Sequence, residues 1–163
     1  MDLILGNLFS LLAMISDSVS SSRKTAKSVL LVQTLSQVFY GCSAIVLKGY
    51  SGAVQNAVSI LRNLAAIRNI QSKVLEWILL LSGVALGLVF NNLGIVGYLP
   101  ILANLEYTWA VFRFRDNERA LKVAFLVNAF LFAIFNGAIL NFVGLVSNII
   151  LVGMILVFLL KKA

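Results

Sequence analysis

Apolar runs of about twenty residues dominate the chain, and short clusters of charged, asparagine and glycine residues separate them. A helix of roughly 20 apolar residues crosses a bilayer core of about 30 Å, so each run predicts a membrane-spanning helix. Strands are excluded because the runs are too long and open sheet edges are not tolerated in hydrocarbon. The pattern predicts seven helices, over residues 3–20, 27–47, 51–69, 73–90, 94–114, 118–140 and 143–160.

Composition strengthens this prediction of an all-α membrane protein. Of the 163 residues, 61% are hydrophobic and 12% are charged, and the mean hydropathy of +1.00 exceeds what a soluble core needs. Seven closely connected spans take up this length, so we expect no sizeable soluble domain. Asp2 stands where a secretory signal carries positive charge, and we therefore expect the first apolar run to be a retained helix.

Basic residues predict the orientation, because cytoplasmic loops carry an excess of lysine and arginine. With seven alternating spans, twelve of the thirteen basic residues fall on one side, and Lys48 falls on the other. The N-terminus is then outside and the C-terminus cytoplasmic. These residues lie between apolar runs and not on one solvated face, which argues against nucleic-acid binding. The cytoplasmic set is Arg23, Lys24, Lys27, Arg62, Arg68, Lys73, Arg113, Arg115, Arg119, Lys122, Lys161 and Lys162.

The motif G-x-V-x-N occurs twice, 92 residues apart, at Gly52–Asn56 and at Gly144–Asn148. Both copies follow a predicted outside turn, and the preceding segments 33–40 and 128–135 both mix polar and aromatic residues. A single linker helix between two three-helix units makes both units enter the membrane in the same direction. We therefore predict two parallel three-helix bundles, residues 1–70 and 93–163, around a linker helix in residues 71–92, related by an axis along the membrane normal.

Polar side chains inside the predicted spans are the candidate functional residues, because they cost free energy at membrane depth unless they face the bundle interior or each other. Two helices carry polar stripes at helical spacing. We expect such linings to suit a neutral polar solute. The alternative is that these amides only join helices, through hydrogen bonds worth about 0.6 to 2 kcal/mol. The stripes are Gln55, Asn56, Ser59, Arg62 and Asn63, and Gln33, Ser36, Gln37, Tyr40 and Ser43.

Repeat symmetry predicts that Asn56 and Asn148 meet at one central solute site. The predicted site is completed by residues of three other segments. Glu106 lies deep in the span 94–114, with Arg62 at similar depth, so a structural ion pair and a coupling role for Glu106 both stay open. The supporting solute ligands are Gln33, Asn104, Glu106, Trp109 and Asn128.

Three further features bear on packing and chemistry. Gly83 and Gly87 form G-x-x-x-G, which permits close helix packing or oligomerisation. Pro100 predicts a kink or hinge in the span 94–114. The chain has no histidine and one cysteine, Cys42, and no metal-ligand spacing or nucleophile–base pair is present, so we expect no metal, no cofactor and no enzyme activity.

The segment Thr108–Trp109–Ala110–Val111–Phe112–Arg113, preceded by Leu99–Pro100 and by Asn56–Ala57, resembles the YgjV-type family of bacterial inner-membrane proteins. This resemblance covers the chain from about residue 27 onward and implies the bacterial inner membrane. The overall arrangement resembles SWEET sugar facilitators and the PQ-loop and PnuC-type transporters. In the SWEET group, asparagines of the third and seventh helices face the solute, which implies this role for Asn56 and Asn148. That group also has prolines in the first two helices of each bundle, whereas Pro100 is the only proline here.

These observations favour a transporter or facilitator of a small polar metabolite, sugar-like or vitamin-like, that works by alternating access between the two bundles. The alternative is a non-transport assembly or regulatory protein whose intramembrane amides are structural. The expected partners are the lipid bilayer and a small polar solute, and a homo-oligomer is possible. The sequence does not identify the solute or decide between uniport and proton coupling.

Overall fold

The computed structural model describes residues 1–21, 23, 25–70, 72–114 and 117–161, and its described residues form helices without any β-strand. All seven predicted helices are present. A short 3₁₀ helix, η1, takes the first four residues of the predicted span 94–114, so its α-helix begins later than predicted. The elements are α1 Asp2–Ser21, α2 Ala26–Val46, α3 Tyr50–Ile67, α4 Lys73–Val89, η1 Gly94–Gly97, α5 Tyr98–Arg113, α6 Glu118–Ala138 and α7 Phe142–Lys161.

Five segments are long and apolar enough to cross a membrane: α1, α2, η1 with α5, α6 and α7. The other two fall short for different reasons. Helix α4 is strongly apolar but has 17 residues, and α3 carries the polar stripe that includes Gln55 and Arg62. The molecule is therefore an all-helical membrane protein with five clearly apolar spans.

Side-chain caps explain where several helices begin. The hydroxyl of Thr25 accepts the backbone N–H of Ser28 before α2, and the side-chain oxygen of Asn117 accepts the N–H of Ala120 before α6. Each bond satisfies a backbone donor that has no partner inside its helix. Ser72 caps α4 in the same way. Two of these caps, Thr25 and Asn117, lie at matching positions before helices of 21 residues each.

The helices α2 and α6 also end alike. Lys48 and Leu140 both have φ of 59°, and the next residue in each case donates its N–H back into the last turn of the helix. A residue in the left-handed region reverses the chain and satisfies helix-end carbonyls. Tight turns into α3 and α7 follow from this geometry.

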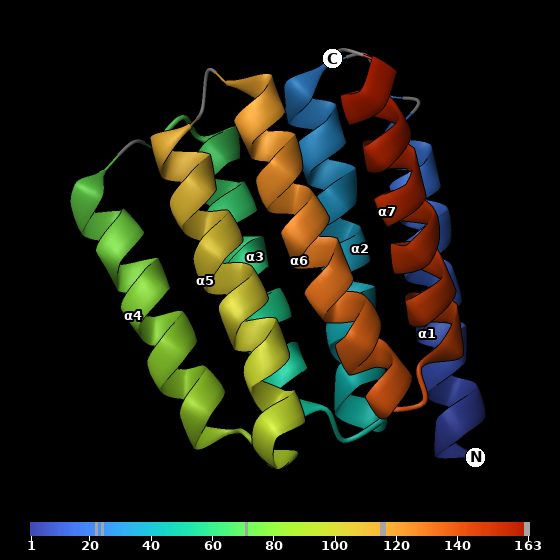
Figure 1. The fold of residues 1–163 in the computed structure, drawn as a ribbon. Coiled ribbons are helices and arrows are strands. Elements are labelled where there is room, and N and C mark those ends of the chain that lie inside the picture. The colour runs from blue at the N-terminus through green and yellow to red at the C-terminus, as the bar shows by residue number, and fades with distance from the viewer. Residues whose placement is uncertain (22, 24, 71, 115–116, 162–163) are drawn as a thin grey trace.

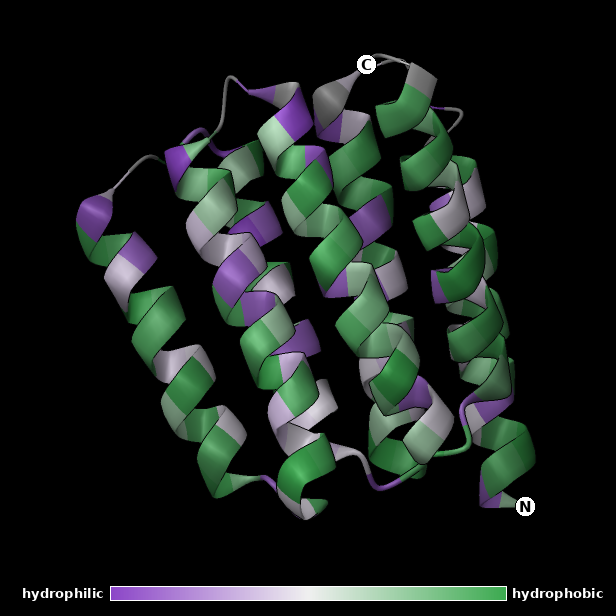
Figure 2. Cartoon of the chain, viewed as in Figure 1, coloured by the Kyte–Doolittle hydropathy of each residue, from purple (hydrophilic) through white to green (hydrophobic). Residues whose placement is uncertain are grey.

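The helices form two layers (Figure 1). In one layer α2 lies between α1 and α3, and in the other α6 lies between α5 and α7. The layers meet where α1 packs on α7 and where α3 packs on α5, and α4 packs against both α3 and α5. Successive helices run in opposite directions, so the start of α1 and the end of α7 lie at opposite ends of the bundle (Figure 1). Hydropathy colouring of the ribbon shows mostly apolar residues along the helices, with hydrophilic residues toward the end at which α7 finishes (Figure 2).

Element boundaries repeat at the spacing of the G-x-V-x-N motif. Helices α2 and α6 begin at residues 26 and 118, and α3 and α7 begin at residues 50 and 142. Helix α1 spans residues 2–21, and η1 with α5 spans residues 94–113. Every one of these boundaries is displaced by 92 positions, with no insertion or deletion between the two copies.

Candidate functional site

The interface between α3 and α5 contains a buried cluster of five polar side chains, which we call the polar cluster: Gln55, Ser59, Arg62, Asn104 and Thr108. Asn104 lies at its centre. The Asn104 Oδ1 accepts hydrogen bonds from Ser59 Oγ at 3.1 Å, Arg62 Nη1 at 3.0 Å and Thr108 Oγ1 at 3.3 Å. The Asn104 Nδ2 donates to Gln55 Oε1 at 2.9 Å. These contacts link the two layers of the bundle.

Arg62 is the charged member of the polar cluster and is 8% exposed. Its Nη1 also donates to Thr108 Oγ1 at 3.0 Å, and its guanidinium lies 4.8 Å from the centre of the Tyr107 ring. Among the described residues it forms no ion pair with a carboxylate. Neutral oxygens and one aromatic face therefore hold this cation, an arrangement that is costly at membrane depth and that usually marks function.

The ion pair that the sequence suggested between Arg62 and Glu106 is not formed. Asn104 and Thr108 are four residues apart and point toward α3. Glu106 is two residues from each, and two residues turn a helix by about 200°, which places its side chain on the opposite side of α5. The sequence placed Arg62 and Glu106 at similar depth, but the Glu106 side chain points to the side of α5 that faces away from Arg62.

Helix α4 covers the polar cluster. Gln55 Nε2 donates to the carbonyl oxygen of Gly83 at 2.8 Å. A Cβ atom on Gly87 would lie 2.6 Å from Gln55 Nε2 and 2.7 Å from Ile101 Cγ1, so only glycine allows this approach. The G-x-x-x-G motif therefore serves packing within the chain. The small pocket that remains beside Gln55, Asn104 and Thr108 has no space for a water molecule.

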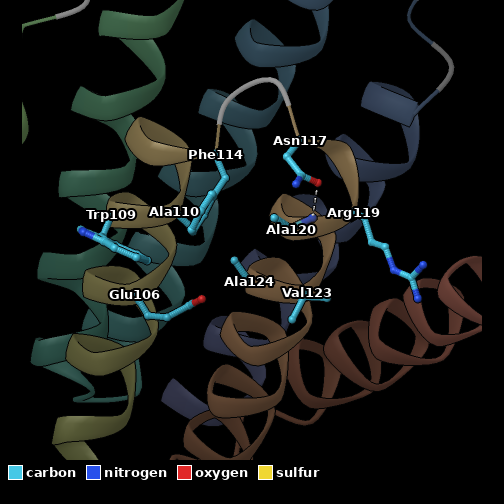
Figure 3. Close-up of a pocket in the computed structure, with 9 residues that line it drawn as sticks. All are labelled: Glu106, Trp109, Ala110, Phe114, Asn117, Arg119, Ala120, Val123 and Ala124. Atoms are coloured by element: carbon cyan, nitrogen blue, oxygen red, sulfur yellow. Dashed lines mark hydrogen bonds between the residues drawn. The ribbon is translucent and has the colours of Figure 1, made fainter.

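An open groove of about 410 Å³ lies on the other side of α5, between α5 and α6 (Figure 3). Its walls are mostly small or apolar side chains. Glu106 reaches from α5 toward α6, and its Oε2 is buried without a hydrogen-bond partner among the described residues. The lining residues are Glu106, Trp109, Ala110, Phe114, Asn117, Arg119, Ala120, Val123 and Ala124.

The two predicted solute asparagines form matching local bonds. Asn56 Nδ2 donates to the Gly52 carbonyl at 3.0 Å, and Asn148 Nδ2 donates to the Gly144 carbonyl at 2.9 Å. Helix α3 packs on α2, α4 and α5, whereas α7 packs on α6 and α1. No hydrogen bond joins the two amides in the described part of the chain, and their role at a shared solute site stays a prediction.

The other predicted residues are divided among three places. Asn104 belongs to the polar cluster, and Asn128 Nδ2 donates to the backbone carbonyl of Ala103 at 2.9 Å, next to it. Glu106 and Trp109 line the groove, although Trp109 points away from α6 (Figure 3). Gln33 is half-buried on α2, apart from these groups.

Pro100 is buried in the first turn of α5, directly after η1. A proline in a first turn removes no hydrogen bond that α5 itself needs, and α5 continues to Arg113 without a break. The change of helix type precedes the proline. Its predicted role as a hinge stays untested.

Sequence reasoning missed two groups of residues. Thr108 was not selected, although its spacing of four from Asn104 was a usable signal. A second polar contact was also missed, in which the Tyr40 hydroxyl lies 3.1 Å from Ser147 Oγ and interacts with the carboxylate of Asp17. It joins α1, α2 and α7, which no local pattern places together.

The apolar spans and the buried polar side chains define a multi-pass membrane protein. The family model Imp-YgjV, described as a bacterial inner membrane protein, matches residues 4–163, and the chain belongs to this family. The resemblance predicted from Thr108–Arg113 is thereby confirmed and extends to the first helix. The protein is located in the bacterial inner membrane. No curated protein and no solved structure matches the chain, and the architectural resemblance to SWEET, PQ-loop and PnuC-type transporters stays a prediction.

Proposed function

We propose that this protein is a transporter or facilitator that moves a small polar metabolite across the inner membrane, without a chemical reaction. The observation that carries the proposal is the polar cluster, a desolvated group of hydrogen-bonding side chains between α3 and α5. Intramembrane ionisable residues such as Arg62 commonly mark solute or ion pathways. The partners in this proposal are the bilayer and one solute, and a homo-oligomer can be tested by native mass spectrometry.

The proposed topology has seven spans, with the N-terminus outside and the C-terminus cytoplasmic. It includes α3 and α4, because both run alongside the five clearly apolar spans (Figure 1). The proposed units are residues 1–70 and 93–163, with α4 in the linker 71–92. The shared 92-residue displacement of helix boundaries supports this division.

In the proposed mechanism the two three-helix units rock against each other. The main helix–helix contacts between the units are α3 on α5 and α1 on α7, so the polar cluster lies at one of these two seams. Opening this seam separates Arg62 from Asn104 and Thr108, and a solute with hydroxyl, amide or carbonyl groups replaces the lost bonds. Asn56, Asn148, Gln33 and Asn128 remain the proposed ligands along the rest of the path.

The first step in testing the proposed transport function is to identify the solute. A ligand that binds the folded state raises its thermal stability, so the purified protein is screened against sugars, nucleosides, vitamins and amino acids. Uptake of any stabilising compound into proteoliposomes is then measured. We expect the double variant Asn56→Ala with Asn148→Ala, and the variant Asn104→Ala, to lose uptake.

Asn92→Ala is the matched control, because Asn92 is an exposed amide that bonds the Lys48 carbonyl in a turn. Unchanged uptake in the control with loss in the other variants supports the site. Unchanged uptake in every correctly inserted variant contradicts it.

One observation favours a second candidate function, a non-transport assembly or regulatory protein. The polar cluster satisfies its amides internally and has no space for a water molecule. In this candidate function the cluster has a purely structural role, which is to hold the helices together. This candidate predicts no stabilising solute and a protein partner that co-purifies in stoichiometric amount after crosslinking in the native membrane.

A further inference from the structure

The groove between α5 and α6 has the form of a ligand site that opens sideways. Its volume of about 410 Å³ is within the range of roughly 300 to 1,000 Å³ typical of small-molecule sites. Phe114, Trp109 and Val123 at its edges are exposed apolar side chains. In a membrane such side chains face lipid, so the groove is open toward the bilayer.

Small side chains create the space. Ala110 on α5 and Ala120 and Ala124 on α6 line the groove, and larger residues at these positions would fill it (Figure 3). Ala110 and Ala124 are buried, so they belong to the walls between the helices and not to the outer surface.

Glu106 supplies the chemistry of the groove. Its carboxylate extends toward Val123 and Ala124, and its Oε2 has no hydrogen-bond partner in the described part of the chain (Figure 3). No lysine or arginine forms an ion pair with it there, since the described ion pair joins Arg113 to Glu76. A carboxylate at membrane depth is stabilised mainly by a nearby positive charge.

The basic residue of the groove does not supply that charge. Arg119 lines the end of the groove near the start of α6, but its guanidinium points away from Glu106 (Figure 3). The groove therefore combines an apolar surface, access from the bilayer and one carboxylate that pairs with no described residue.

We propose that this groove binds a lipophilic organic cation, with its ammonium or phosphonium centre beside Glu106 and its apolar body against Ala110, Phe114 and Val123. Charge complementarity selects the cation, and the apolar walls select a hydrophobic body. This site is separate from the polar cluster, which lies on the opposite side of α5, so the inference does not depend on the proposed transport function.

Tetraphenylphosphonium is a suitable probe, because it is a permanent cation with an apolar surface. Equilibrium binding of the radiolabelled probe is measured with the full chain in lipid nanodiscs, and empty nanodiscs give the background. We expect saturable binding of one probe per chain. Glu106→Gln should raise the Kd at least about tenfold, because it removes the charge and keeps the shape.

A second variant tests the space independently of the charge. Ala124→Leu fills the groove while leaving Glu106 in place, and we expect it to abolish saturable binding. Ala85→Leu is its control, because Ala85 is exposed on α4 and the added side chain enters lipid. Thermal unfolding confirms that each variant is folded.

Neutral triphenylphosphine oxide gives a comparison that needs no variant. We expect it not to compete with the cation in the wild-type protein. The proposal is overturned if wild-type binding is not saturable, if Glu106→Gln binds as tightly as wild type, if Ala124→Leu retains the site, or if the neutral compound competes equally. The last result identifies an apolar site for lipid chains.

Discussion

The two seams between the layers occupy equivalent positions in the 92-residue repeat, yet equivalent residues at the two seams differ in polarity. At the seam of α3 and α5 lie Arg62 and Asn104, and the equivalent positions at the seam of α7 and α1 are Met154 and Leu12. All four residues lie within α-helices. The same helical framework therefore carries a buried polar pair at one seam and exposed apolar side chains at the equivalent positions of the other.

Helix α4 accounts for the difference. It packs on α3 and α5, and Arg62 and Asn104 there are 8% and 3% exposed. The described residues provide no corresponding helix over α7 and α1, where Met154 is 61% exposed and Leu12 is 39% exposed. A side chain that faces lipid must be apolar, whereas one covered by protein can be polar if its hydrogen bonds are satisfied.

The largest expected effect comes from Asn104→Leu, which places the residue of the apolar seam in the polar one. The change removes one hydrogen-bond partner from each of the buried side chains Arg62 and Gln55, so we expect the protein to lose about 3 kcal/mol of stability. Equilibrium unfolding in mixed detergent micelles measures this loss. A loss below about 1 kcal/mol would show that the polar cluster contributes little.

A second change should recover part of that loss. Adding Arg62→Met to Asn104→Leu removes the buried charge and copies the equivalent pair, Met154 and Leu12. We expect the double variant to be about 2 kcal/mol more stable than Asn104→Leu alone, because adjacent members of one network couple at this magnitude. The same unfolding experiment is done on the wild type, the two single variants and the double variant. If the two changes in stability simply add, Arg62 and Asn104 are not coupled.

The packing of α4 over the seam of α3 and α5 is tested by Gly87→Ala. The added Cβ meets Gln55 and Ile101 at less than 3 Å and should move α4 outward, at a cost of about 1 to 2 kcal/mol. Gly153→Ala in α7 is the matched control, because no atom lies within 4 Å of its Cβ position. Thermal unfolding of both variants measures the difference. Equal stability would mean that α4 does not pack tightly on the seam.

The smallest effect is expected from Met154→Arg, which places a charge at the uncovered seam. Residue 154 lies seven positions before the end of α7, so the long side chain can extend toward the interface at a cost of about 1 kcal/mol. Stability in nanodiscs measures it, and Met154→Leu is the control. A loss as large as that of Asn104→Leu would show that position 154 is covered by another chain.

Much of the helical framework could be predicted from local sequence. Apolar runs predict the seven helices, and the two G-x-V-x-N motifs begin in the first turns of α3 and α7. The exception is residues 94–97, where η1 replaces the expected α-helix. The 3₁₀ geometry precedes a buried proline, and helix periodicity alone does not distinguish the two helix types.

The candidate site was predictable only in part. Periodicity selected Gln55 and Arg62 on the polar stripe of their helix, and Asn104 was selected as an amide at membrane depth. It did not reveal that Arg62 bonds Asn104 and not Glu106, since similar depth in the membrane says nothing about which way a side chain points around its helix axis.

The sequence by itself determined the class of this protein, because hydropathy over twenty residues decides whether a helix is more stable in lipid than in water. It also determined the spacing of the two copies, because caps and turns depend on neighbouring residues. Only the tertiary structure decided that α4 covers one seam, that Gly83 and Gly87 face Gln55, and that Glu106 lines a groove on the far side of α5. These features depend on which helices become neighbours, and that choice is made by packing between segments far apart in the chain.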